Sequence, residues 1–236
     1  MNKRFSIIIP VLHEGRGIND LIGHLRELET AEESELIVVD GGVTGDTINA
    51  ITDGAALRLS CAPGRSRQMN TGAAAASGDI LLFLHADTRL PADALTRINA
   101  AMERPTYIGG AFNLGIRSSR WIYRIIEAAA SARSRLTRIP YGDQAIFIRK
   151  EAFQRLGGYP EIPIMEDVAI MRRIKKSGGR IHIISRCVAT SPRRWEQEGI
   201  LYTTLRNWFL LAAYYLGVSP TKLAGHYTSG EKTDDR

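Results

Sequence analysis

The sequence predicts a single α/β domain built around a mostly parallel sheet. Short runs of β-branched residues alternate with helical stretches through the first half of the chain, which is the pattern of βαβ units. These apolar runs lack the strict alternation of half-exposed strands, as expected where helices cover both faces of a sheet. With 236 residues, of which 44% are hydrophobic, the chain is long enough to bury one large core.

The first half of the chain supplies the elements on which that prediction depends. Glycine, proline and small polar residues separate the apolar runs, which marks each run as a separate element. The expected strands span residues 5–12, 35–40, 56–61 and 79–84, and the expected helices lie near 21–28, 47–51 and 66–76.

Beyond Pro91 the pattern changes, and the remaining segments are expected to complete the sheet and to build the acceptor side. The expected helices span 92–103, 118–138, 166–176 and 199–216, with strands over 109–116, 145–150 and 181–184. We expect residues 1–200 to form the domain, 201–227 a C-terminal apolar helix and extension, and 228–236 a polar tail.

The charge balance favours anionic partners. Lys and Arg number 31 against 25 Asp and Glu, so the formal net charge is +6, which suits nucleic acid, phospholipid headgroups and sugar diphosphates alike. Cys61 and Cys187 lie far apart and outside any CxxC spacing, which favours reduced thiols in a cytosolic protein. The N-terminal MNKRFSIIIPV lacks the length and cleavage site of a signal peptide, so a first buried strand is expected there.

The strongest local feature is the His-Ala-Asp segment that ends the run DILLFLHAD. In an open α/β sheet, ligands bind beyond the carboxyl ends of the strands, which is where His85 and Asp87 are expected. Carboxylate oxygens suit Mg²⁺ or Mn²⁺, and an added imidazole favours Mn²⁺. The alternative is structural, with Asp87 capping the turn before Pro91 and His85 a polar residue whose hydrogen bonds are satisfied.

Further polar groups are expected near the same edge of the sheet. His13 and Glu14 follow the first run, and Asp40 ends the second before two glycines. Such a loop exposes backbone N–H groups to a ligand, although a simple Asp turn explains the same residues. Arg65 and Arg67 precede a helix, where arginines and unpaired N–H groups favour an anion. A solvated basic turn is the alternative there.

The segment MEDVAIMRRIKK places two acids at the start of a helix. The helix dipole favours acids in a first turn, so Glu166 and Asp167 have a purely structural explanation. The glycines and prolines that precede them form a shaped loop, which could instead hold one carboxylate in a cleft. A carboxylate held there could remove the proton of an acceptor hydroxyl.

Together these features resemble, in the same order, the family 2 glycosyltransferases of the GT-A fold. IIIPVLHE resembles the family's first strand, which ends in Pro-x-x-Asn-Glu, and VDGGVTGDT resembles its Val-Asp-Asp-Gly-Ser-x-Asp-Gly-Thr loop. His85-Ala86-Asp87 resembles the metal-binding Asp-x-Asp, and Glu166-Asp167 resembles the pair that supplies the base. SPRRW resembles the Gln-x-x-Arg-Trp of processive members. The resemblance covers residues 5–200.

The resemblance implies an inverting transfer of a sugar from a nucleotide-diphosphate donor to an acceptor hydroxyl or carboxylate, including one carried on a lipid. Asp167 is the implied base, and Asp87 with His85 would hold the Mn²⁺ or Mg²⁺ ion that bridges the phosphates. The positions implied on the donor side are Pro10, Glu14, Asp40, Arg65 and Asn70. The positions implied on the acceptor and diphosphate side are Glu166, Arg194 and Trp195.

The sequence departs from the family pattern at three positions. Gly41 replaces the second Asp of the nucleotide loop, and His85 replaces the first Asp of the metal motif. Fewer carboxylates around the donor affect base specificity and metal affinity. Ser191 stands where processive members carry Gln, which argues against polymer synthesis. Within the family, the sequence resembles small bacterial carotenoid-acid or lipid glycosyltransferases.

Two interpretations of the C-terminal helix stay open. Residues 201–216 carry an apolar stripe at helical spacing, which either packs into the core or lies in a membrane interface at the cytoplasmic face. The uninterrupted run WFLLAAYYLGV is far short of the roughly 20 residues that a membrane span needs.

Two other functions compete with glycosyl transfer. A sugar-phosphate nucleotidylyltransferase is expected to carry a glycine-rich loop with Lys or Arg directly after the first strand, and PVLHEGRG fits this poorly. A nucleotide- or RNA-binding module would interleave aromatic residues with its arginines, and only Trp121 and Tyr123 are suitably placed. We therefore expect no nucleic-acid partner.

Overall fold

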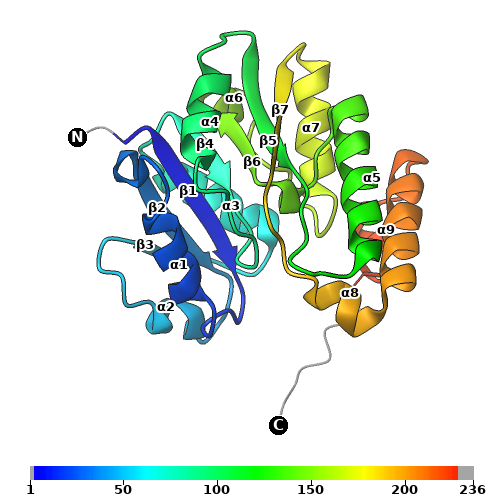
Figure 1. Cartoon of the computed structure of the whole chain (residues 1–236), viewed down its shortest axis with the longest axis horizontal. Helices are drawn as coiled ribbons and strands as arrows, with labels where there is room; N and C mark the ends of the chain where they lie inside the picture. The colour runs from blue at the N-terminus through cyan, green and yellow to red at the C-terminus, as the bar shows by residue number, and fades with distance from the viewer. Residues whose placement is uncertain (1–2, 228–236) are drawn as a thin grey trace.

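The structure is a computed structural model that describes residues 3–227. A seven-stranded mixed sheet runs through the molecule, and helices cover both of its faces (Figure 1). The strands lie in the order β3-β2-β1-β4-β6-β5-β7. Their bounds are β1 Phe5–Val11, β2 Ser34–Asp40, β3 Leu57–Ser60, β4 Ile80–Phe83, β5 Tyr107–Asn113, β6 Ile146–Arg149 and β7 Arg180–Cys187.

The first four strands are parallel and end at one edge of the sheet. In this register Ile8 of β1 lies beside Ile37 of β2 and Phe83 of β4. The chain therefore leaves β1, β2 and β4 at neighbouring points, as the strand-end rule for open α/β sheets requires. The predicted α/β class with a mostly parallel sheet is confirmed.

Strand β6 interrupts the parallel order because it runs antiparallel to both of its neighbours. Phe83 of β4 pairs with Ile146 of β6, and Gly110 of β5 pairs with Phe147. A Cβ on Gly109 or Gly110 would collide with the carbonyl oxygen of Phe147 or His182. The Gly-Gly pair therefore permits the close approach of three strands.

The helices are joined to the strands by short connections. Their bounds are α1 Ile18–Arg26, α2 Asp46–Ala50, α3 Arg65–Ala75, α4 Ala94–Met102, α5 Trp121–Thr137, α6 Lys150–Arg155, α7 Glu166–Lys176, α8 Arg193–Glu198, α9 Ile200–Tyr215 and α10 Pro220–Ala224, with short 3₁₀ turns η1 Ala31–Glu33 and η2 Gly142–Gln144.

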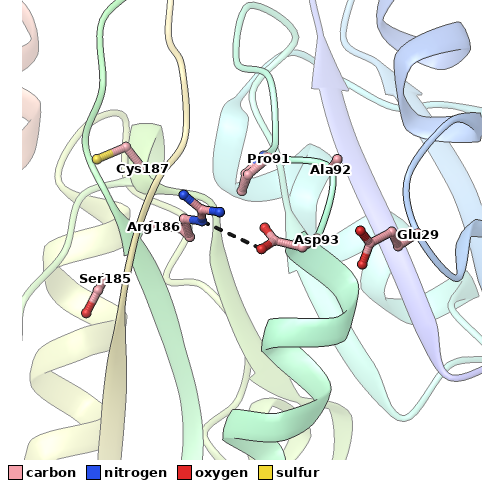
Figure 2. Close-up of a pocket in the computed structure, with 7 residues that line it drawn as sticks. All are labelled: Glu29, Pro91, Ala92, Asp93, Ser185, Arg186 and Cys187. Carbon is pink, nitrogen blue, oxygen red and sulfur yellow. Dashed lines mark ion pairs between the residues drawn. The ribbon is translucent and has the colours of Figure 1, made fainter.

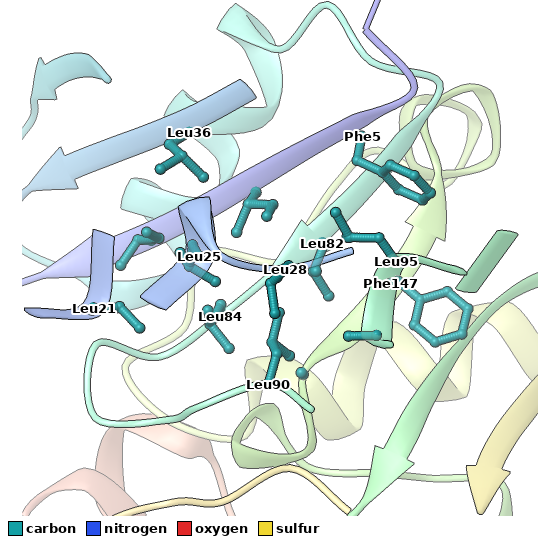
Figure 3. Packing of buried hydrophobic residues seen from close by; sticks show 14 of the residues in the cluster. Phe5, Leu21, Leu25, Leu28, Leu36, Leu82, Leu84, Leu90, Leu95 and Phe147 are labelled. Atoms are coloured by element: carbon teal, nitrogen blue, oxygen red, sulfur yellow. The ribbon is translucent and has the colours of Figure 1, made fainter. Parts of the chain in front are cut away.

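Separate cores fill the two faces of the sheet. On one face, Leu21 and Leu25 of α1 and Leu95 of α4 pack against Leu82 and Phe147 (Figure 3). On the other face, side chains of α3, α6 and α7 pack against the opposite sides of the same strands. Burial on both faces explains the continuous apolar runs in the sequence.

Helix α9 differs from the expectation of a core helix. Its buried positions are Thr203, Arg206, Leu210 and Ala213, whereas its large apolar side chains face outward. The exposed stripe consists of Leu201, Tyr202, Leu205, Trp208, Phe209 and Leu216. The core interpretation is wrong for this stripe, because periodicity alone does not say which side of a helix packs inward.

Within residues 3–227, none of the helices is long and apolar enough to cross a membrane. The expected polar tail, 228–236, lies outside the described residues.

Candidate active site

The antiparallel pairing of β4 and β6 brings two polar segments together. Because Phe83 pairs with Ile146, the residues that follow β4 lie beside those that precede β6. The first segment carries His85 and Asp87, and the second is η2, Gly142–Gln144. This position was not predicted, because it depends on pairing between strands that are distant in sequence.

Gly142 joins this region to the start of α7. Its backbone N–H donates a hydrogen bond to Asp167 Oδ2 at 2.8 Å. A Cβ on Gly142 would lie 2.7 Å from His85 Nε2 and 3.8 Å from Asp167 Oδ2. The imidazole and the carboxylate therefore face the same small space. An acidic strand-end motif and the Glu-Asp helix, which the sequence separates by 80 residues, meet here.

Burial shifts the pKa values of two side chains in this cluster. Burial raises the pKa of Asp143 to about 6, against the Arg133 charge and with the help of the Asp167 and Asp87 carboxylates. Asp143 Oδ1 is buried and has no hydrogen-bond partner. Burial also lowers the pKa of His85 to about 3, together with the positive charges of Arg65 and Arg194. At neutral pH the imidazole is therefore uncharged.

Glu166 has a different environment from its neighbour Asp167. Its side chain is 5% exposed and forms an ion pair with Arg65, at 3.5 Å between Nη1 and Oε1. Burial raises the Glu166 pKa against the Arg65 charge, and the Asp167 carboxylate raises it further. Met165, which precedes the pair, has a φ of 67°. Left-handed backbone in a non-glycine residue is a strained feature that clusters at functional sites.

Two side chains at this site are of the kind that binds a divalent cation, the His85 imidazole and the Asp87 carboxylate. Among residues 3–227, no three His, Cys, Asp or Glu side chains could hold a metal ion by themselves. The uncharged His85 imidazole and the Asp87 carboxylate nevertheless provide two suitable donor groups. Mg²⁺-type sites commonly use one or two carboxylates and take their remaining ligands from phosphates and water.

Asp40 lies at the end of β2 and is completely buried. Its Oδ1 accepts a hydrogen bond from the Gly42 N–H at 2.7 Å, while its Oδ2 has no partner. Buried carboxylate oxygens without a partner are costly. An unfilled acceptor therefore faces the loop at which the sequence resembles a nucleotide-binding segment.

The departure at Gly41 has a structural explanation in α3. Gln68 donates from Nε2 to the carbonyl oxygens of Val11, at 2.7 Å, and Val39, at 2.9 Å. A Cβ on Gly41 would lie 3.0 Å from Gln68 Cδ. The Gln68 amide thus occupies the space beside Gly41 and joins the ends of β1 and β2.

The SPRRW segment forms α8, and its residues point to different places. Arg193 donates to Glu14 Oε1 at 3.0 Å, and the Glu14 contact raises the Arg193 pKa. Arg194 contacts the hydroxyl of Tyr227 and lies over its ring, 4.5 Å from the centroid. Trp195 instead packs on Tyr123, with ring centroids 6.1 Å apart.

Two predicted donor-side residues have structural contacts. Asn70 makes a pair of hydrogen bonds with the backbone of Tyr159, each at 2.9 Å. Pro10 lies within β1, beside Val39.

The sequence interpretation missed Asp143, Arg193 and Tyr227. The signal for Asp143 was available, because the polar YGDQ directly precedes the apolar run AIFI. Tyr227 gave no comparable signal, since it belongs to no motif.

A separate hollow of about 610 Å³ lies between the start of α4 and the end of β7 (Figure 2). Arg186 and Asp93 face each other across it, at 3.6 Å. Its lining contains none of the predicted site residues.

The sheet order and the strand-end site define a GT-A fold. The solved structure of S. aureus TarS 1–349 superposes with a TM-score of 0.63 at 14% identity, covering 93% of this chain and 68% of that chain. The mannosyltransferase PcManGT from Pyrobaculum calidifontis, in complex with GDP-Man and Mn²⁺, superposes with a TM-score of 0.59 at 22% identity, covering 81% and 57%.

The sequence comparison is more specific than the fold. The profile of the family described as "Glycosyl transferase family 2" matches residues 6–159. The chain belongs to this family. Glucosyl-3-phosphoglycerate synthase of Mycobacterium tuberculosis (strain H37Rv) is 33% identical over 94 residues, which cover 36% of this chain. The match spans only 29% of that relative's length.

Proposed function

We propose that this enzyme transfers a sugar, with inversion, from a nucleotide-diphosphate donor to an acceptor hydroxyl or carboxylate. The observation that carries the proposal is that His85 and Asp167 meet at Gly142. A Cβ built on this glycine would lie 2.7 Å from His85 Nε2 and 3.8 Å from Asp167 Oδ2. Gly142 thus brings the His85 imidazole, which would lie on the diphosphate side, close to the Asp167 carboxylate. Family membership supports the same reaction.

The donor's nucleoside end would bind at the ends of β1 and β2. Asp40 offers an unfilled buried acceptor, Oδ2, to a hydroxyl or amino group of the nucleoside. Glu14 and Arg193 form an ion pair beside it, and Arg65 adds a cation at the start of α3. Pro10 and Asn70 remain predictions at the donor side, where their contacts give them a supporting role.

His85 and Asp87 would hold the divalent cation, which would take its remaining ligands from the donor's phosphates and from water. When bound, such an ion neutralises charge on the departing nucleoside diphosphate. An imidazole ligand favours Mn²⁺ over Mg²⁺, and the structure of the mannosyltransferase PcManGT contains Mn²⁺.

Asp167 would act as the general base. A hydroxyl acceptor loses its proton to the Asp167 carboxylate as its oxygen attacks the anomeric carbon from the face opposite the diphosphate, whereas a carboxylate acceptor attacks without this proton transfer. The bond from that carbon to the phosphate oxygen breaks, and the electron pair leaves with the nucleoside diphosphate. The Gly142 N–H bond holds Oδ2 in place for this step. Glu166, fixed by Arg65, would position its neighbour.

A panel of nucleotide sugars tests this proposal. A donor that binds the folded protein must raise its thermal midpoint, and we expect one donor to do so in the presence of Mn²⁺ and to be hydrolysed slowly. Salt-sensitive RNA retention, without any nucleotide-sugar stabilisation or hydrolysis, would contradict the proposal and favour a binding module.

The acceptor, in this proposal, is carried on a lipid at the cytoplasmic face of the membrane. The exposed stripe of α9 supports this assignment, since Trp208 is 62% and Phe209 63% exposed. Large exposed apolar patches on soluble proteins mark interaction sites. Assignment to the carotenoid-acid or lipid subgroup stays a prediction. Liposome flotation that leaves the protein in the unbound fraction would contradict membrane contact.

A further inference from the structure

A basic cavity lies where the carboxyl ends of α5, α7 and α9 come together. Its volume is about 460 Å³, within the range of ligand pockets. The lining residues are Thr137, Ile139, Arg172, Lys175, Lys176 and Tyr215. The three helices run side by side in Figure 1.

The cavity holds more positive charge than its surroundings neutralise. Arg172, Lys175 and Lys176 form no ion pair with any residue in the range 3–227. The carboxyl end of a helix carries roughly half a negative charge, so three helix ends offset only part of three full cations. Lys175 also donates to the Thr137 carbonyl oxygen at 3.2 Å. Arg172 lies over the rings of Tyr214 and Tyr215, 5.7 and 5.4 Å from their centroids. Contacts to the face of a guanidinium leave its in-plane N–H donors open to a phosphate.

Exposed apolar residues stand next in sequence to two of the lining residues, Thr137 and Tyr215. Leu136 is 85% exposed and Leu216 86% exposed, and each directly adjoins a residue of the lining. From Leu216 the exposed stripe continues along α9. A ligand that combines an anionic group with a long apolar part would match both features.

We propose that this cavity binds the phosphate group of an anionic membrane lipid, with its acyl chains lying along the exposed stripe of α9. The inference rests on the membrane contact proposed above, but it does not depend on glycosyl transfer. A second copy of the chain fits less well, because two such surfaces would bring like charges together.

Vesicle flotation tests the proposal with three forms of the full chain. These are the wild type, Arg172→Ala/Lys176→Ala, and the matched control Arg104→Ala/Arg155→Ala, which removes the same charge elsewhere. Vesicles contain phosphatidylcholine alone or with phosphatidic acid. Since each cation near an anionic membrane contributes about 1 kcal/mol, the cavity variant should bind the anionic vesicles roughly twentyfold to thirtyfold more weakly. Equal binding by the cavity variant and the control would overturn the proposal.

A competition arm distinguishes a lipid from a soluble phosphate compound. Glycerol phosphate and inorganic phosphate are added separately, and thermal stability is followed in all three forms. One outcome is that either compound stabilises the wild type and the control but not the cavity variant, while no form binds anionic vesicles. This outcome would support a phosphate site and reject the lipid source. Another outcome is that the wild type is a dimer by light scattering, the Trp208→Ser/Phe209→Ser variant is a monomer, and neither binds vesicles. This outcome would assign the stripe to a second copy of the chain instead.

The same samples separate this proposal from the proposed transferase function. Nucleotide-sugar hydrolysis should be unchanged in the cavity variant, because Arg172 and Lys176 contact neither the donor side nor Asp167. If the cavity variant loses vesicle binding but keeps nucleotide-sugar hydrolysis, the result supports the cavity proposal independently of the transferase proposal. Vesicle binding without hydrolysis of any donor would leave the lipid site standing and contradict the transferase.

Discussion

The backbone N–H of Gly142 donates to Asp167 Oδ2 at 2.8 Å, and the same glycine leaves room for the His85 ring. A Cβ at this position would lie 2.7 Å from His85 Nε2, closer than atoms of this kind approach. One small residue thus positions the candidate base and makes space for a candidate metal ligand.

Gly142→Ala should lower transfer at least tenfold, because the added Cβ would push the imidazole out of the proposed metal site. Gly23→Ala is the matched control, since a Cβ there meets nothing within 4 Å. The apparent Mn²⁺ requirement and turnover are measured for both variants. Equal turnover in the two would show that His85 does not need its present position.

Asp167→Asn should reduce turnover by about 10²–10⁴ while leaving donor binding nearly unchanged, as for loss of a general base. The amide oxygen of Asn can still accept the Gly142 N–H bond, so the local fold should persist. Single-turnover kinetics and donor-induced thermal shifts separate the two effects. Asp79→Asn, at an exposed ion pair with Arg4, serves as the control, and unchanged turnover in Asp167→Asn would remove the residue from the mechanism.

Glu35 should make folding stability depend on pH. Its Oε1 accepts hydrogen bonds from the Ser6 hydroxyl, from the hydroxyl and N–H of Ser77, and from the Gly78 N–H. Burial opposes the charged form, but these hydrogen bonds outweigh it and lower the Glu35 pKa below its ordinary 4.5. The stabilisation is therefore complete above pH 4.5 and is lost as pH falls through the lowered pKa.

The Glu35→Gln variant isolates this contribution. Its deficit in the free energy of unfolding, relative to wild type, should be largest near neutral pH and should shrink in acid. Urea unfolding at several pH values measures it. A deficit that is constant with pH would mean that the carboxylate charge contributes nothing.

Truncation at two nearby positions of α9 should change the free energy of unfolding by very different amounts. Leu210 is 1% exposed and Trp208 is 62% exposed. Leu210→Ala should cost about 2–5 kcal/mol of stability through lost burial and a cavity. Trp208→Ala should change stability by less than about 0.5 kcal/mol, as for a surface site. A large loss from Trp208→Ala in thermal unfolding would contradict the outward orientation of the stripe.

Most of the fold could be predicted from local sequence patterns. The bounds of α7 match the expected helix, 166–176. Strands β1, β2 and β4 end at, or within two residues of, the polar residues His13, Asp40 and His85. Buried parallel strands leave a strong signal, since both faces need apolar side chains. The missed helices α6, α8 and α10 have five or six residues each, too few to show a helical period.

The site was less predictable because it depends on non-local pairing. Asp143 lies beside Asp87 only because β6 enters the sheet next to β4. Strand order is not encoded in either segment alone, so Asp143 could not be placed from spacing. Helix α9 shows a related difficulty. Its apolar stripe was recognised from the sequence, but the stripe faces outward because the opposite face, with Thr203 and Arg206, is the buried one.

The interleaved position of β6 also constrains how the chain can be divided. A fragment that stops before β5 would leave the edge of β4, ILLF, uncovered along its whole length. An exposed apolar edge of this kind recruits other strands and leads to aggregation. The parts of the chain before and after residues 104–106 therefore depend on each other for a covered sheet, and a fragment that ends there should be insoluble in a sedimentation assay.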